Sequence, residues 1–129
     1  MDPVETKSKK QMEDEINKAL IAFQEEYMGG APASVQAFIV QDILMIRLSG
    51  ILSPSELKLA EENQEGCQLV KESRWRLLEN VQDVLCSIVK RITGCSLSTL
   101  YTDVSTRTGE MFLTMTLSED LEQKLSAER

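Results

Sequence analysis

The segment EMFLTMTL (residues 110–117) carries the clearest periodic signal in the sequence. Its large aliphatic side chains recur at every second position: Met111, Leu113, Met115 and Leu117. Successive side chains of a β-strand point to opposite faces of the sheet, so this alternation predicts a strand with one strongly apolar face. Such a face must be covered by another layer of structure, and this requirement decides the fold class.

The residues before this strand predict its hairpin partner. SLSTLYTDV (residues 96–104) has the composition of a strand, and STRTG (residues 105–109) is a polar segment that ends in glycine. Such a segment between two strands is typical of a hairpin loop with a bulge, but polar loops on a rigid sheet also often bind ligands. Two interpretations stay open: a structural turn, or a ligand or partner loop made of Asp103, Ser105, Thr106, Arg107, Thr108 and Gly109.

A second hairpin is predicted in ASVQAFIV (residues 33–40) and ILMIRLSG (residues 43–50), which are rich in strand-forming residues. The two residues between them, Gln41 and Asp42, form a poor tight-turn sequence, so we expect the loop to be a residue or two longer. Apolar residues occur on both faces of these strands. We therefore expect the second face to be partly covered; its apolar members are Phe38, Val40, Ile43 and Met45.

Helices are predicted on both sides of this hairpin. Residues 11–28 carry apolar side chains at spacings of three and four, and Gly29-Gly30 ends the segment. SPSE (residues 53–56) is a helix start, because Ser53 can cap the helix and Glu56 can reach back as its capping-box partner. A glycine break is expected at Gly66.

One long helix is predicted from residue 68 to residue 93 and ends at Gly94. We expect residues 119–129 to form a tail or a short helix capped by Ser118, and residues 1–9 to be flexible. Residues 1–129 thus predict a single α+β domain with the order α-β-β-α-α-β-β and a short C-terminal helix or tail. The four strands form an antiparallel sheet from two hairpins, with helices mainly on one face and the strand order left open.

Composition narrows the classes of function. The chain has a net charge of −7 and a pI near 4.7, which argues against nucleic acid as a partner because phosphate contacts need a basic surface. No segment approaches the roughly 20 apolar residues of a membrane-spanning helix, and no apolar run follows residues 1–10 to make a signal peptide. The expected location is the cytoplasm.

Catalytic and metal sites are not expected. The chain has no histidine, which removes the usual triads and the commonest metal ligand, and its three cysteines show no paired-ligand spacing. Neighbouring acidic residues such as Glu61-Glu62 diverge on a helix instead of converging on a substrate. We therefore assign no catalytic residue, no metal site and no cofactor.

Aromatic residues mark candidate partner surfaces. Trp75, the single tryptophan, stands among Lys71, Arg74 and Arg76. This cluster could stack on a base, hold an anion or contact a partner through Trp75, or its charges could simply pair with Glu72 and Glu79. The apolar stripe of the first helix includes Phe23 and Tyr27. That stripe either packs within the chain or lies between two subunits.

Three segments together resemble the MpsC-like family, small bacterial proteins named for a sodium-translocating, membrane-potential-generating system. The segments are VQAFIVQDILMIRLSGILSPSELKLAE (residues 35–61), GCQLVKESRWRLLENVQDVLCSIVKRITG (residues 66–94) and TDVSTRTGE (residues 102–110). The likeness spans roughly residues 10–118. One departure is Gly29-Gly30-Ala31-Pro32, where the family often carries Gly-Arg-Gly-Pro.

The resemblance implies a soluble cytoplasmic accessory or regulatory protein, associated with a membrane ion-translocation system, and it supplies no catalytic residues. The expected function is therefore non-enzymatic and acts through contacts with a protein partner or with a second copy of the chain. The alternative is a small-molecule or anion-binding domain that uses the 103–109 loop.

Overall fold

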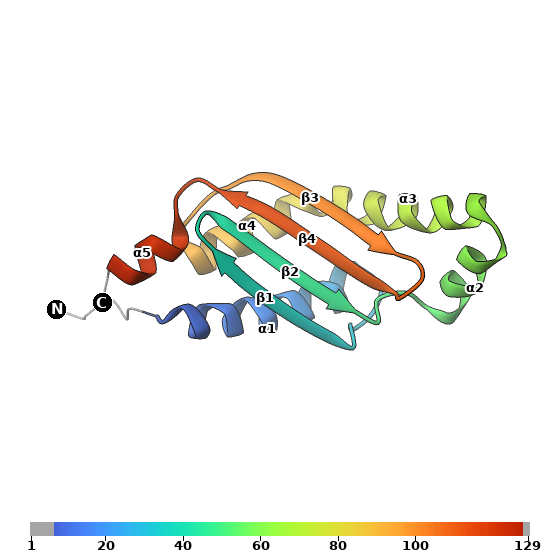
Figure 1. Cartoon of the computed structure of the whole chain (residues 1–129), viewed down its shortest axis with the longest axis horizontal. Helices are drawn as coiled ribbons and strands as arrows, with labels where there is room; N and C mark the ends of the chain where they lie inside the picture. The colour runs from blue at the N-terminus through green and yellow to red at the C-terminus, as the bar shows by residue number, and fades with distance from the viewer. Residues whose placement is uncertain (1–6, 128–129) are drawn as a thin grey trace.

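The structure is a computed structural model that describes residues 7–127. The N-terminal segment expected to be flexible lies mostly outside these residues, as does the end of the C-terminal tail. The chain forms a four-stranded antiparallel sheet with helices on one face, which confirms the predicted α+β class (Figure 1). The strands are β1 (Ser34–Val40), β2 (Ile43–Ser49), β3 (Leu97–Ser105) and β4 (Glu110–Leu117).

The strand order, which the sequence left open, is β1-β2-β4-β3. β2 and β4 therefore lie side by side in the centre, and their registered pairs include Leu44 with Met115 and Ile46 with Leu113. All four of these side chains are fully buried. The alternating apolar side chains of residues 110–117 thus lie in the middle of the core.

The turn between β1 and β2 is tighter than expected. Gln41 and Asp42 alone connect the strands, and Gln41 has a φ of 57°, in the left-handed region. The Gln41 N–H donates to Oε1 of Glu122 at 2.9 Å, and the Gln41 carbonyl accepts from the Glu122 N–H at 3.2 Å. The helix α5 (Leu121–Ala127) therefore supports a turn that the local sequence does not favour. Asp120, not the expected Ser118, accepts from the Gln123 N–H at the start of α5.

The helical layer is built from α1 (Lys9–Tyr27), α3 (Gln64–Asn80) and α4 (Gln82–Thr93), with α2 (Pro54–Glu62) beside α3. Among residues 7–127, none of the helices combines the length and the apolar character needed to cross a bilayer. Both predicted members of the capping box at the start of α2 are in place, since Ser53 and Glu56 each accept a backbone N–H of the other.

The expected single helix over residues 68–93 is wrong. α3 and α4 are separate helices that meet at Val81, whose backbone has a φ of −117° and a ψ of 18°. α3 packs mainly against α2, whereas α4 packs mainly against α1, so the two segments have different main neighbours although both touch β3. Apolar residues spaced three and four apart predict a helix, but they do not show where its packing partner changes.

The break expected at Gly66 is also misplaced. Gly66 lies in the first turn of α3, and the chain turns at Asn63, whose side chain accepts the Gly66 N–H at 2.7 Å. A Cβ at residue 66 would lie 2.1 Å from the carbonyl oxygen of Leu59 in α2. Gly66 is therefore required for the close approach of two helices.

The Arg74 side chain, only 9% exposed, holds four segments together. Its Nε donates to Glu56 at 3.0 Å and its Nη2 donates to the same carboxylate at 2.6 Å. It also donates to the carbonyl of Met28 at the end of α1 and to that of Ile51 after β2, both at 2.8 Å. Burial alone would raise the pKa of Glu56, but the hydrogen bonds from Arg74 and Ser53 together lower the pKa below its usual 4.5.

We predict that Arg74→Met lowers the free energy of unfolding by about 3 kcal/mol or more, because it leaves a partly buried carboxylate unpaired. Adding Glu56→Gln should recover about 1–2 kcal/mol of that loss, while the carbonyls of Met28 and Ile51 stay without their donor. Urea unfolding of the two single variants and the double variant measures this coupling. The control is Arg76→Met, which removes an exposed pair with Glu72 and should cost no more than about 0.5 kcal/mol. If the effects of the Arg74 and Glu56 changes on the unfolding free energy are strictly additive, the two side chains do not stabilise each other as proposed.

Acid should weaken the fold through the same carboxylate. A carboxyl group whose pKa is lowered on folding stabilises the folded state above its unfolded pKa, and this contribution is lost as the pH falls through its folded pKa. We expect the unfolding free energy to drop more steeply for the wild type than for Glu56→Gln between about pH 5 and about pH 3. Parallel pH profiles for the two proteins would show that the pKa of Glu56 is not lowered.

Candidate functional site

The two outer edges of the sheet differ. At the β1 edge, Oε2 of Glu13 in α1 accepts the N–H of Ile39 at 2.9 Å, and α1 packs along this strand. At the β3 edge, the Val104 N–H is bonded to Oδ1 of its neighbour Asp103 at 2.9 Å and so points away from β4. Peptide groups alternate in direction along an antiparallel strand, so those of Leu100 and Thr102 point outward as well. Within residues 7–127, the β1 edge is covered and the β3 edge is open.

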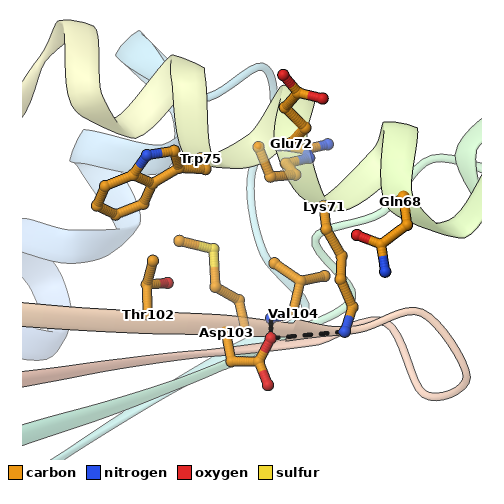
Figure 2. A pocket seen from close by; sticks show the side chains of 9 residues that line it. Gln68, Lys71, Glu72, Trp75, Thr102, Asp103 and Val104 are labelled. Carbon is orange, nitrogen blue, oxygen red and sulfur yellow. Dashed lines mark hydrogen bonds and ion pairs between the residues drawn. The ribbon is translucent and has the colours of Figure 1, made fainter.

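A groove of about 390 Å³ lies between α3 and β3. α3 contributes Gln68, Lys71 and Trp75 to its lining, and β3 contributes Thr102, Asp103 and Val104 (Figure 2). The groove brings together Trp75 and Asp103, two candidates that the sequence placed in separate elements. We call it the α3–β3 groove.

One ion pair crosses the mouth of the α3–β3 groove. Nζ of Lys71 lies 3.7 Å from Oδ1 of Asp103, whose side chain is 82% exposed (Figure 2). An exposed pair of this length contributes little stability. Arg76 pairs with Glu72 at 2.7 Å as the sequence suggested, but Arg74 pairs with Glu56, not with Glu79. The Lys71–Asp103 pair can therefore open at small cost.

Thr102 is the functional candidate that sequence reasoning missed. Its side chain points from β3 toward Trp75 (Figure 2), and its buried Oγ1 has no hydrogen-bond partner among residues 7–127. A buried hydroxyl without a partner costs about 1–3 kcal/mol, so such groups are rare in folded proteins. Alternation along β3 would have placed Thr102 on the inward face, but nothing in the sequence shows that its hydroxyl lacks a partner.

The 105–109 segment forms the turn of the second hairpin. The Gly109 N–H donates to the Ser105 carbonyl at 2.8 Å, and Gly109 has a φ of 78°. The Thr108 N–H donates to Oγ of Ser105 at 3.3 Å, and Oγ1 of Thr106 lies 3.1 Å from Sγ of Cys67 in α3. Arg107 is exposed at the tip. The polar groups of this segment mostly serve the turn and its attachment to α3.

Phe23 and Tyr27 lie next to each other on α1. Phe23 is 2% exposed in the core, and the centre of its ring lies 5.5 Å from that of the half-buried Tyr27. The stripe of α1 is therefore used for packing within the chain, because α1 covers β1 and α4.

The outer face of the sheet is not covered by any of residues 7–127, contrary to the expectation of partial cover. Apart from the half-buried Ile43, its large apolar side chains are 37–62% exposed: Phe38, Val40, Met45, Tyr101 and Phe112. We call this surface the outer sheet face. Antiparallel sheets tolerate one solvated face, but that face is usually polar.

Residues 7–127 contain no group of three or more side chains able to hold a metal ion. Burial raises the pKa of the Cys86 and Cys95 thiols, so neither is activated as a nucleophile.

Because Oγ1 of Thr102 has no hydrogen-bond partner among residues 7–127, Thr102→Val should raise the free energy of unfolding by about 1 kcal/mol. The matched control is Thr114→Val on the outer sheet face, which tests for a general gain from valine in a strand and should change stability by less than about 0.5 kcal/mol. Urea unfolding measures both. A loss of stability in Thr102→Val would mean that the hydroxyl has a partner within the chain.

Known proteins that are similar to this chain agree with the resemblance seen in the sequence. The family model described as "Na+-translocating membrane potential-generating system (MpsC)" matches residues 8–119. The uncharacterized protein YbcI of Bacillus subtilis (strain 168) is 35% identical over 119 residues, which cover 92% of this chain and 95% of the relative. No solved structure matches the chain. The chain therefore belongs to the MpsC family.

Proposed function

We propose that this chain is a non-enzymatic accessory or regulatory protein that binds an extended segment of a partner protein in the α3–β3 groove. The observation that carries the proposal is the open edge of β3 beside a groove that contains an unpartnered Thr102 hydroxyl. An extended segment can add to an open sheet edge by backbone hydrogen bonds, while its side chains enter the neighbouring groove. No other part of residues 7–127 combines these features.

Each part of the α3–β3 groove has a role in this binding mode. The outward peptide groups of Leu100, Thr102 and Val104 pair with the incoming backbone. Trp75, 37% exposed, covers an apolar side chain of the segment, as tryptophan does at many interface hot spots. The Thr102 hydroxyl is buried, so a polar side chain of the segment bonds to it only if the groove opens on binding.

Asp103 regulates access to the edge in this proposal. Its carboxylate occupies the Val104 N–H that an incoming carbonyl needs. Binding therefore requires this hydrogen bond to open, and Lys71 keeps the released carboxylate paired at the groove mouth. A carboxylate on an edge strand also discourages uncontrolled pairing of sheets.

The family's description names a sodium-translocating system, so we place the partner among the proteins of such a system and the function in the cytoplasm. No catalytic residue or cofactor is assigned. The 103–109 loop as an anion site is less well supported, because Ser105, Thr106 and Thr108 are engaged in the turn.

The test is site-specific photocrosslinking in the source organism. A photoreactive residue at Gln68, in the groove, should capture a defined protein, whereas one at Leu77, on the other side of α3, should not. A synthetic peptide of the captured segment should bind the purified chain, and Trp75→Ala should weaken its Kd about tenfold or more. Capture of the same protein from both positions, or peptide binding unaffected by Trp75→Ala, would contradict the proposal.

A further inference from the structure

The outer sheet face has two unlike halves. On β1 and β2 it presents apolar side chains and a cation, namely Phe38, Val40, Met45 and Arg47. On β4 and β3 it presents aromatic, hydroxyl and acidic side chains, namely Phe112, Thr114, Glu110, Tyr101 and Asp103. The register aligns these residues in rows across the sheet, one from Phe38 through Met45 and Thr114 to Tyr101.

The two halves already attract each other within the chain. Nε of Arg47 donates to Oε2 of Glu110 at 2.7 Å, and the Arg47 guanidinium lies 5.9 Å from the centre of the Phe112 ring. Between two copies, the same contacts can form in exchange for those within each chain. A surface whose halves are complementary can bind a second copy through a two-fold axis.

We propose that two copies of the chain pack their outer sheet faces together, about a two-fold axis that runs along the strands between β2 and β4. This axis places Phe38 opposite Tyr101 of the partner subunit and Arg47 opposite Phe112 of the partner subunit. The two sheets then pack face to face with nearly aligned strands, as in β-sandwiches. An axis across the strands would stack each strand on its own copy, so acidic halves would meet acidic halves.

The size of the face suits a weak dimer. Four strands about 4.8 Å apart and about seven residues long form a face of roughly 20 by 23 Å. Two such faces bury on the order of 1,000 Å² in total, near the lower limit for specific interfaces. We therefore expect a reversible dimer with a Kd on the order of 10–100 μM.

The dimer and the α3–β3 groove use different surfaces, apart from Asp103, which belongs to both. The groove opens on the helical side of β3, between that strand and α3, whereas the outer sheet face lies on the opposite side of the sheet. Both surfaces can be occupied at once, and failure of one proposal leaves the other standing.

Sedimentation equilibrium from about 5 μM to about 1 mM tests the dimer. The wild type should associate reversibly, and Phe38→Glu should weaken association about tenfold or more while circular dichroism stays unchanged. Leu69→Glu, at a side chain 53% exposed on α3, is the matched control and should associate like the wild type. A wild type that stays monomeric throughout, or equal weakening by both variants, would overturn the proposal.

Cysteine crosslinking tests the axis. Phe38 and Tyr101 lie on the two outer strands, with β2 and β4 between them, so cysteines at both positions cannot bridge within one chain. The Phe38→Cys/Tyr101→Cys double variant should form covalent dimers under mild oxidation, and Phe38→Cys alone should not exceed the wild-type background. Efficient dimer formation by Phe38→Cys alone would place the axis across the strands and overturn the arrangement.

Discussion

The fold depends on one buried guanidinium. Arg74 satisfies a carboxylate and two backbone carbonyls that belong to three other segments, so it fixes where α1 ends, where α2 begins and how α3 lies against them. A lysine has no planar arrangement of donors with which to make these bonds together. Trp75 follows Arg74 by one residue, which turns its side chain about 100° around α3 and toward β3. By holding α3 in place, Arg74 therefore also positions Trp75 in the α3–β3 groove.

One face and one edge of the sheet are covered, and the other face and the other edge are exposed. Helices cover the inner face, and Glu13 and Glu122 bond to backbone N–H groups of β1 and of the turn that follows it. In the part of the chain that the structure describes, the outer sheet face and the β3 edge carry no such cover, apart from the contact that Asp103 makes with Val104 and Lys71. Soluble proteins usually cover or block open edges and apolar faces because both invite association. The functional proposals concern the two surfaces that this chain leaves open.

Local patterns predicted local structure well. The alternation at residues 110–117 identified the central strand β4, and Ser53 with Glu56 identified the start of α2, because both signals act over a few residues. The break at Val81 and the place of Gly66 were missed because tertiary neighbours decide them. The sequence pointed to the exposed residues Trp75 and Asp103 separately. Their proximity depends on the strand order, which no local pattern contains.

The open edge of β3 is the central claim, and amide hydrogen exchange followed by NMR on the isolated protein tests it most directly. The amide of Ile39 is held by Glu13 and should exchange slowly, whereas the outward amides of Leu100 and Thr102 should exchange much faster. This contrast should persist at protein concentrations where the chain dimerises, because the proposed dimer buries the outer sheet face and leaves the edge free. Protection of Leu100 and Thr102 equal to that of Ile39 in the free protein would show that the β3 edge is already covered and would contradict the account.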